Sequence, residues 1–348
     1  IAATTINVLN APPRLTGLSA TPSVEGGVTV LSGTIEDAGA DDTFTLDIDW
    51  GDGETQTVSL AVNGRTFAVP HTYADDNADD LATISVVARD DDGGFTSGVV
   101  TTTVGNSGPR IDDLLITPVE EAGVATLSGT IFDAGVEDTF TVTVDWGDGA
   151  IDTFALAADA RDFSFTHRYT DDSPTGTPAD TVPVVINVQD DDGNGEIRFP
   201  TTVVSNVAPS IVRLTATDLD EGRQTRLIGQ FVDPGVEDTF TVEIDWGDGS
   251  PVDTVMLSGA DREFEFTHRY TDDRPTGTPA ERPTIRATVV DDDGGVDVAT
   301  VSPLVRNVAP HIVGLMATDP LEGGATTLTG SIVDPGDEDT FTLVVEWG

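Results

Sequence analysis

The sequence contains no cysteine and no lysine, and only 6% of its residues are aromatic. Without cysteine, the chain can be neither a disulfide scaffold nor a thiol enzyme. All 16 basic residues are arginine, and against 62 acidic residues they leave a formal net charge of −46. We therefore expect no nucleic-acid partner and no binding to an anionic membrane, because both need a basic surface. No apolar run is long enough to cross a bilayer, so we expect no membrane insertion within this sequence.

The sequence is built from a repeat. The tetrapeptide Trp-Gly-Asp-Gly occurs at residues 50–53, 146–149 and 246–249, and a fourth copy starts at Trp347, so the tryptophans are 96, 100 and 101 residues apart. This period predicts an array of one domain type. A domain of that size can bury a core without disulfides. The expected parts are a last strand of a preceding repeat, three complete repeats and a truncated fourth, at residues 1–10, 11–106, 107–206, 207–307 and 308–348.

The hydrophobic pattern of each repeat is typical of β-strands. Residues 44–50 alternate strictly, with Phe44, Leu46, Ile48 and Trp50 on one side and polar residues on the other. This period of two indicates a half-buried strand. In the first repeat it predicts seven strands, at about 15–20, 28–35, 44–50, 56–61, 66–73, 82–89 and 95–104. The fold class is therefore all-β, with tandem immunoglobulin-like antiparallel β-sandwiches arranged as an extended rod.

Four ordered motifs recur at fixed spacing, namely Trp-Gly-Asp-Gly, His71-Thr-Tyr73, Asp90-Asp-Asp-Gly-Gly94 and Asn206-Val-Ala-Pro209, with their equivalents in the other copies. Together they resemble the polycystic-kidney-disease (PKD) domain family over the whole chain. The resemblance implies an immunoglobulin-like β-sandwich, used mostly in extracellular surface proteins and as an accessory module of secreted hydrolases. It implies no catalysis, and the residues show no nucleophile–base pair and no phosphate loop.

The acidic residues fall almost entirely in loops. Sandwich topology sorts these loops into an N-terminal pole and a C-terminal pole, and stacking in series brings the C-terminal pole of one repeat to the N-terminal pole of the next. The first junction would then gather Glu25, Asp75, Asp76, Asn106, Asp133, Glu137, Asp138, Asp190, Asp191 and Asp192. The second would gather Glu121, Asp171, Asp172, Asn206, Asp233, Glu237, Asp238, Asp291 and Asp292. Equivalent positions elsewhere are Glu221, Asp272, Asp273, Asn307, Asp334 and Asp339, and, at the start of the chain, Asn10, Asp37, Asp42 and Asp90.

Such a set of carboxylates needs a counter-charge. Two of them about 4 Å apart repel by roughly 1 kcal/mol even in water. Ca²⁺ accepts six to eight oxygen ligands in flexible geometry, so we predict Ca²⁺ at each junction, stiffening the array. The arrangement is similar to the inter-domain calcium sites of cadherins, although the cadherin linker Asp-x-Asn-Asp-Asn is absent. The alternative is that the acids are simply solvated, or adapt the surface to high salt.

The histidines and tryptophans are predicted to be structural. His71, His167 and His268 each stand two residues before a tyrosine, in a pattern resembling the tyrosine corner of sandwiches, and we expect them to bond loop backbone. A metal-binding or catalytic role is the alternative. His311 is expected on the surface. All four tryptophans end an inward-facing pattern, which favours core packing over carbohydrate stacking.

Two longer loops, at residues 171–180 and 272–281, both contain Pro-Thr-Gly-Thr-Pro. They are candidate binding features, or they only thicken the junctions.

The leading functional hypothesis is a structural segment of a long extracellular stalk, filament or adhesin at the cell surface, whose partners are its own neighbouring repeats. Exposed strand edges leave open a lateral association with other copies of the chain. The alternatives are an array of modules that bind surface glycans or proteins, and a non-catalytic spacer of a secreted hydrolase. Short linkers with proline, such as Asn206–Pro209, predict restricted bending between repeats.

Overall fold

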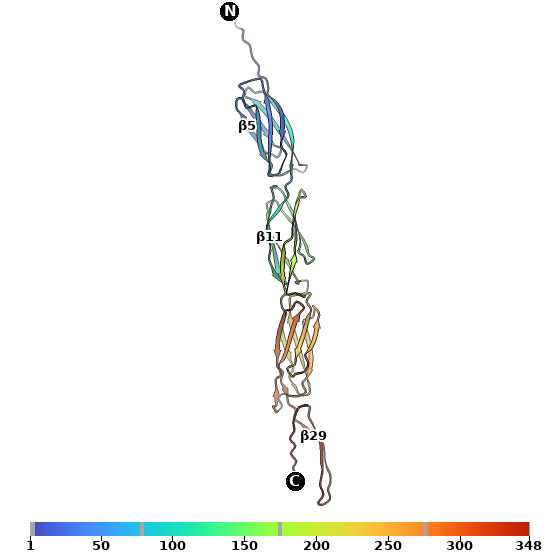
Figure 1. The fold of residues 1–348 in the computed structure, drawn as a ribbon. Helices are drawn as coiled ribbons and strands as arrows, with labels where there is room; N and C mark the ends of the chain where they lie inside the picture. The colour runs from blue at the N-terminus through green and yellow to red at the C-terminus, as the bar shows by residue number, and fades with distance from the viewer. Residues whose placement is uncertain (1–3, 77–79, 173–175, 274–276, 348) are drawn as a thin grey trace. The chain divides into compact units, whose positions relative to one another are not determined.

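The computed structural model describes residues 4–76, 80–172, 176–273 and 277–347. The regular secondary structure in these ranges is entirely β, and they contain no helix that could cross a membrane. The all-β fold class predicted from the strand periodicity is confirmed. The thin grey segments in Figure 1 mark the remaining residues, which include part of both Pro-Thr-Gly-Thr-Pro loops predicted as binding features.

Contacts between Cα atoms divide the chain into two compact units. Unit 1 comprises Ile1–Ile116, Thr126–Thr166 and Pro183–Thr201. Unit 2 comprises Thr117–Ala125, His167–Val182 and Thr202–Gly348. The boundary passes through the second repeat and not through a linker, so the loops of the first junction lie in unit 1 and those of the later junctions lie in unit 2.

The first repeat, in unit 1, is a sandwich of two sheets (Figure 1). One sheet has the order β1-β3-β6, formed by Arg14–Ala20, Val28–Glu36 and Thr66–Thr72. The other has the order β2-β8-β7-β4-β5, formed by Ser23–Val24, Phe95–Gly105, Leu81–Asp90, Phe44–Asp49 and Thr55–Leu60. Seven of these strands lie where the alternation predicted them. The eighth, β2, pairs in parallel with β8 and is too short to show an alternation.

Unit 1 also holds two sheets from the second repeat. Their orders are β14-β11-β9 (Asp162–Arg168, Val124–Phe132, Arg110–Ile116) and β13-β12-β16-β17 (Ile151–Leu156, Phe140–Asp145, Val185–Asp190, Gly195–Arg198). Unit 2 holds the remaining sheet of that repeat, β10-β18-β15 (Val119–Glu120, Thr201–Ser205, Ala179–Pro183).

The rest of unit 2 repeats the same plan. Its sheets are β19-β21-β24 (Ser210–Ala216, Gln224–Val232, Glu263–Arg269), β23-β22-β26-β27 (Asp253–Leu257, Phe240–Asp245, Ile285–Asp291, Val296–Val301) and β20-β28-β25 (Leu219–Asp220, Val305–Arg306, Ala280–Glu281). A two-stranded sheet, β29-β30 (His311–Ala317, Leu328–Val333), follows.

Prolines explain why the two long strands β7 and β8 of the first repeat are each divided in the later repeats. Thr83 and Val100 lie inside β7 and β8, whereas the equivalent residues of the second repeat are Pro183 and Pro200. Proline has no N–H to donate to a sheet ladder, so pairing stops there. Pro283 and Pro303 stand at the corresponding breaks of the third repeat. The breaks of the second repeat coincide with the boundary between the two units.

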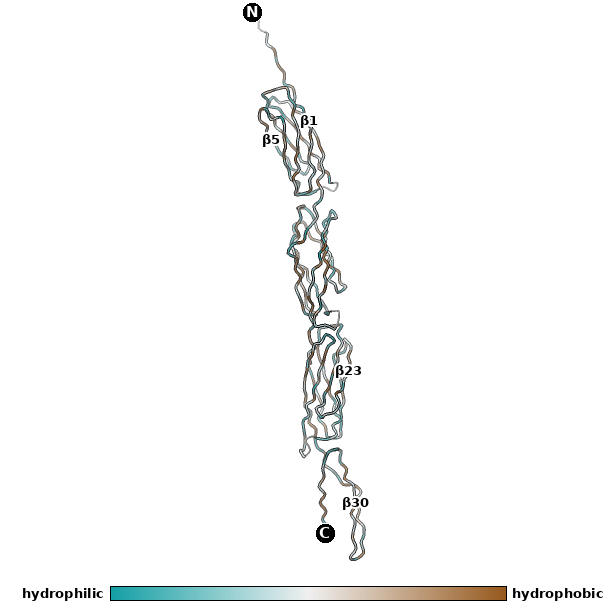
Figure 2. Tube along the Cα trace, in the orientation of Figure 1, coloured by the Kyte–Doolittle hydropathy of each residue, from teal (hydrophilic) through white to brown (hydrophobic). Residues whose placement is uncertain are grey.

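The core consists of the inward-facing residues that the alternation predicted. Leu31, Leu46 and Val86 are fully buried in the first sandwich, and Trp50, Trp146 and Trp246 are at most 1% exposed. The alternation of hydrophobic and hydrophilic residues along the strands can be followed in Figure 2. The prediction is wrong for Trp347, which is 65% exposed.

The two ends of the chain also differ from the strand predictions. Residues 4–13 form no strand, and neither do residues 334–347. A strand is stabilised by its ladder of hydrogen bonds to a neighbour, and neither segment pairs with a strand among the described residues. Trp347 lies in the second of these segments, and no described sheet covers it.

Candidate metal sites at the repeat junctions

One glutamate follows each short parallel strand and is buried. Glu25, Glu121 and Glu221 are 1%, 3% and 1% exposed. In each case Oε1 accepts a hydrogen bond from a linker N–H, that of Ser107, Val207 or Val308, at 2.8, 2.9 and 2.7 Å. Oε2 is buried and accepts no hydrogen bond from the described residues. The linker therefore fixes the carboxylate and leaves one oxygen available to a ligand.

The loop after β3, β11, β21 and β30 has the sequence Asp-x-Gly-x-acidic-Asp in every copy. Its first aspartate accepts the N–H of the glycine through Oδ1, at 2.7, 3.1, 2.9 and 2.8 Å for Asp37, Asp133, Asp233 and Asp334. Within the described part of the chain, the Oδ2 atom of each of these aspartates is buried without a hydrogen-bond partner. As at the glutamates, one carboxylate oxygen therefore accepts a backbone N–H and the other remains available.

The glycine of this loop is needed for space. A Cβ on Gly235 would lie 2.4 Å from Asp238 Oδ2 and 2.5 Å from Glu121 Oε2, although the backbone of Gly235 is not left-handed. At Gly336 the same atom would lie 2.8 Å from Asp339 Oδ2 and 3.1 Å from Glu221 Oε2. Acids from two consecutive repeats therefore converge on a space that a methyl group would fill.

At the second junction, in unit 2, four buried carboxylates meet. One oxygen each of Glu121, Asp171, Asp172 and Asp238 lies within 4.8 Å of the others. Burial, followed by the charges of Glu121 and Asp233, raises the pKa of Asp238 to about 9. Burial also raises the pKa of Glu121 to about 7, against the hydrogen bond from Val207. The protein alone thus disfavours ionisation of a cluster that a divalent cation would stabilise.

The first junction, in unit 1, brings the corresponding acids together. Oxygens of Glu25, Asp133 and Asp138 lie within 4.8 Å of one another, as do those of Glu25, Asp75 and Asp76. Burial is again the main reason why the pKa of Asp138 rises, to about 8, and hydrogen bonding with Asp75 adds to it.

Two further groups of acids complete the pattern. At the N-terminal pole of the first repeat, one oxygen of each of the equivalent acids lies within 4.8 Å of the others, namely Asp37, Asp42 and Asp90. At the third junction Asp272 and Asp273 are 4% and 1% exposed, and Asp273, Asn307 and Asp339 line one cavity.

Some of the predicted ligands have a different role. Oδ1 of Asp190 accepts the N–H of Asn194, and Oδ2 accepts the amide of the linker residue Asn106, at 2.7 and 3.0 Å. Asp291 binds Asn206 in the same way, and Asp90 binds Asn10, at 3.0 and 2.9 Å. These aspartates hold the linker asparagines, and the buried Oδ1 of Asn106 and of Asn206 has no hydrogen-bond partner among the described residues.

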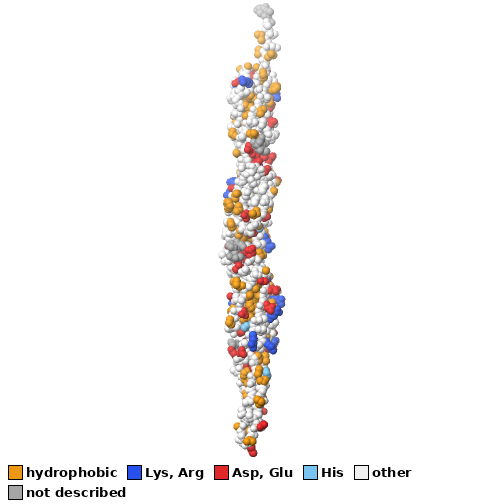
Figure 3. Space-filling view, turned by 90° about the vertical axis from the view of Figure 1, so that its right-hand side faces the viewer, with side chains coloured by type: hydrophobic (Ala, Val, Ile, Leu, Met, Phe, Trp, Pro, Cys, Tyr) orange, Lys and Arg blue, Asp and Glu red, His pale blue; other side chains and the backbone are white. Residues whose placement is uncertain are grey.

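Other predicted ligands lie at the edge of the clusters. Asp191 and Asp292 accept the N–H of Thr139 and of Thr239 through Oδ1, at 2.8 and 2.7 Å, and so connect two loops of one repeat. Asp191 and Asp192 are exposed but have oxygens within 4.8 Å of one on Asp138. Glu137 and Glu237 are exposed. On the face drawn in Figure 3, acidic side chains gather in separate groups.

The sequence reasoning missed an arginine that supports each loop. Nη2 of Arg65, Arg161 and Arg262 donates to the carbonyl oxygen of Gly39, Gly135 and Gly235, at 2.5, 2.6 and 2.9 Å. The guanidinium carbons lie 4.6, 4.6 and 4.4 Å from the ring centroids of Phe44, Phe140 and Phe240. Each arginine directly precedes the strand that leads into the His-x-Tyr motif. Their recurrence at this position in each repeat is the signal that could have identified them.

The donor set fits Ca²⁺. The free atoms are carboxylate and amide oxygens from several loops, with no nitrogen or sulfur ligand, and such sets suit a hard cation of variable coordination number. A dry cluster of like charges is unfavourable unless an ion of opposite charge lies among them. The buried oxygens that accept no hydrogen bond from the described residues are the atoms that could bind such a cation.

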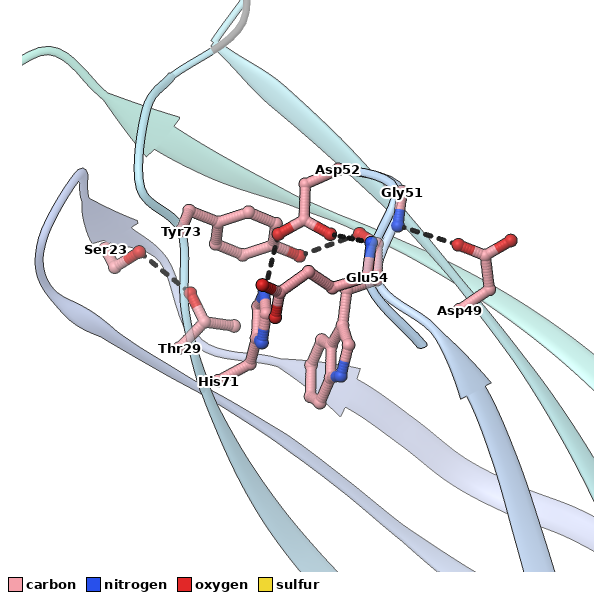
Figure 4. A network of polar contacts seen from close by, with 9 residues as sticks. Ser23, Thr29, Asp49, Gly51, Asp52, Glu54, His71 and Tyr73 are labelled. Atoms are coloured by element: carbon pink, nitrogen blue, oxygen red, sulfur yellow. Dashed lines mark hydrogen bonds and ion pairs between the residues drawn. The ribbon is translucent and has the colours of Figure 1, made fainter. Parts of the chain in front are cut away.

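The histidines form a separate, structural network (Figure 4). His71 Nε2 lies 2.6 Å from Asp52 Oδ2, its ring stacks on Trp50 at 4.4 Å, and Tyr73 Oη donates to the carbonyl oxygen of Trp50 at 3.0 Å. His268 and Asp248 repeat the pair at 2.7 Å. For His71 and His268 the predicted bond to loop backbone is not what the ring makes, because its partner is the aspartate side chain of the Gly-Asp-Gly turn. His311 is exposed, as expected.

The fold defines the chain as a tandem array of immunoglobulin-like β-sandwiches. No protein-family model and no curated protein matches it, so the PKD resemblance stays a prediction.

Among solved structures, the chain is similar to a tetra-tandem repeat from the extending region of a large adhesion protein, with 17% identity, a TM-score of 0.38, and coverage of 92% of this chain and 89% of the other. It is also similar to two fibronectin type III domains of chicken tenascin, with 15% identity, a TM-score of 0.32, and coverage of 54% and 97%. A third similar structure is described as a Ca²⁺-stabilised adhesin that helps an Antarctic bacterium reach out and bind ice, with 15% identity, a TM-score of 0.25, and coverage of 88% and 77%. Likeness at this level carries no argument about function.

Proposed function

We propose that this chain is a structural segment of an extracellular stalk, filament or adhesin, made of PKD-like sandwiches that Ca²⁺ joins at their junctions. The observation that carries the proposal is the set of buried carboxylate oxygens at each junction that accept no hydrogen bond from the described residues. They come from two consecutive repeats, so a bound ion would connect the repeats in addition to the linker.

Burial favours a metal over solvated surface charge. Acids that only solvate a protein or adapt it to high salt lie in water, whereas Glu121, Asp172 and Asp238 are 3%, 0% and 0% exposed. A buried carboxylate without a partner is unfavourable by several kcal/mol, so it is retained only where another group compensates its charge. The chain has 16 basic residues against 62 acidic ones, and the arginines near these loops bind backbone carbonyl groups.

Ca²⁺ also fits an extracellular location. Sites in extracellular modules bind calcium with dissociation constants of about 10⁻⁴ to 10⁻³ M. A stalk whose junctions use this range would be stiff outside the cell and flexible where calcium is scarce. Mg²⁺ fits less well, because it requires near-ideal octahedral geometry and keeps several waters.

Calorimetry with and without a chelator tests the proposal. We expect calcium uptake by the whole chain, an increase in melting temperature in Ca²⁺, and no such increase in Mg²⁺ at the same ionic strength. Small-angle scattering should give a smaller maximum dimension after chelation, because the junctions would bend more freely. Identical melting with and without chelator, together with no calcium uptake, would exclude the proposed metal.

A further inference from the structure

Two acids of the second junction that sequence analysis did not name lie side by side. Asp293 is in the turn between β26 and β27, and Asp180 is in β15. Thr177 holds both: its N–H donates to Asp293 Oδ1 at 2.9 Å, and its hydroxyl donates to Asp180 Oδ1 at 3.0 Å. The N–H of Gly176 donates to the same oxygen of Asp293. One short segment therefore positions two carboxylates from different repeats.

The second oxygens of these groups are buried and available. Asp293 Oδ2 and Asp180 Oδ2 have no hydrogen-bond partner among the residues described, and neither has either oxygen of Asp172. Asp172 is 0% and Asp293 is 4% exposed. Asp172 stands five residues before Thr177, which binds both Asp180 and Asp293.

We propose that Asp172, Asp180 and Asp293 bind a second divalent cation, of the Ca²⁺ class, next to the one at Glu121 and Asp238. This inference rests on the proposed function, because it assumes that the junction binds calcium at all. One oxygen of Asp172 belongs to the cluster with Glu121 and Asp238, and its other oxygen is equally buried. Asp172 would therefore bridge two ions, and the second junction would bind calcium as a pair.

The first junction provides an internal comparison. Asp76, Asp80 and Asp192 occupy the equivalent positions. Asp80 and Asp192 are, however, exposed. Asp80 follows Asp76 by four residues, whereas Asp180 follows Asp172 by eight.

The additional residues of the second junction include Gly176 and Thr177, whose N–H groups bind the incoming aspartate. Gly176 and Thr177 would thus help to hold the ligands of the second site, whereas Asp80 and Asp192 at the first junction are exposed to water. We therefore expect tight binding at the second junction and weak binding at the equivalent position of the first.

Equilibrium dialysis of the whole chain against buffered ⁴⁵Ca²⁺ tests this. Asp180→Asn and Asp293→Asn should each remove one ion per chain at low free calcium, because asparagine still accepts the hydroxyl bond of Thr177 at position 180 and the N–H bonds at position 293 but lacks the charge. Asp80→Asn, the matched control, should leave the number of tightly bound ions unchanged. Asp238→Asn should also reduce the number of bound ions, because it removes a ligand of the first ion at the same junction. Circular dichroism in chelator checks that each variant is folded.

The results separate the two proposals. If Asp238→Asn loses calcium while Asp180→Asn and Asp293→Asn keep the full number, the second ion is wrong and the junction site stands. If the unmodified chain takes up no calcium, both proposals are wrong. A loss in Asp80→Asn equal to that in Asp180→Asn would contradict the role given to the longer loop.

Discussion

Neutralising Glu121 should stabilise the metal-free protein, and calcium should reduce this gain because the variant binds the ion less tightly. In the variant Glu121→Gln, the amide oxygen can still accept the 2.9 Å hydrogen bond from Val207, so the linker contact is retained. The substitution removes the negative charge of a residue that is 3% exposed and close to three other acids, Asp233, Asp172 and Asp171. The substitution therefore isolates the electrostatic part of the site.

The magnitude in chelator follows from the pKa. Burial raises the pKa of Glu121 from 4.5 to about 7, and one pKa unit corresponds to about 1.4 kcal/mol. The stability is fully present below pH 4.5, where the group is protonated in both states, and is lost as the pH rises through 7. At pH 8 the variant should therefore be more stable than the unmodified chain by up to about 3 kcal/mol.

In calcium this gain should be smaller. An ion at 100 times its dissociation constant stabilises the folded state by about 2.7 kcal/mol, and a tenfold weaker site loses about 1.4 kcal/mol of this. Urea unfolding at pH 8, in chelator and in calcium, measures both effects without added salt screening. Glu120→Gln is the control, because its side chain is exposed. If Glu121→Gln lowered the stability in chelator, the glutamate would be a structural acceptor and the reasoning would be refuted.

Three further outcomes are expected. Gly235→Ala should abolish calcium binding at the second junction, measured by titration calorimetry, because its Cβ would lie 2.4 Å from a ligand oxygen, whereas Gly105→Ala has open space and should bind normally. Tyr270→Phe loses a buried 2.8 Å hydrogen bond to Trp246 and should cost about 1–2 kcal/mol in urea unfolding, equally in calcium and chelator; a loss confined to calcium would contradict a structural role. In chelator the melting temperature should fall as the pH rises from 4 to 8, since carboxyls such as Asp172 have raised pKa values (about 6) and bind protons more tightly when folded. Calcium should reverse this trend because it binds the ionised carboxylates. A melting temperature that rises with pH in chelator would contradict the raised pKa values of these groups.

Periodicity predicted most of the fold because each strand has one buried face. The alternation placed four residues on one face of a strand, and the structure buries all of them, namely Phe44, Leu46, Ile48 and Trp50. The short strand β2 could not be seen, since two residues carry no period. Its position nevertheless matters, because the turn that follows it carries Glu25.

The sequence predicted which acidic loops meet at a junction, but not which of their oxygen atoms could bind a metal. Loop topology was enough to bring Glu121 and Asp238 together, but which oxygen remains free depends on backbone donors. Asp190 and Asp291 lie in acidic turns like the other candidates, yet their oxygens are occupied by amide groups. Asp180 was missed because its connection to Asp293 runs through the N–H and the hydroxyl of Thr177, which the sequence does not show.

The division of ligands between the two poles has a consequence for how such a gene can change. In the proposed sites each repeat would supply one set of ligands at its N-terminal pole, such as Asp37 and Asp42, and a complementary set at its C-terminal pole, such as Glu221 and Asp273. The two sets differ, so the contact is head-to-tail and does not close on itself. Duplication or loss of a whole repeat would therefore recreate a complete junction between the new neighbours. Recombination between copies could lengthen or shorten the protein without any new interface having to evolve.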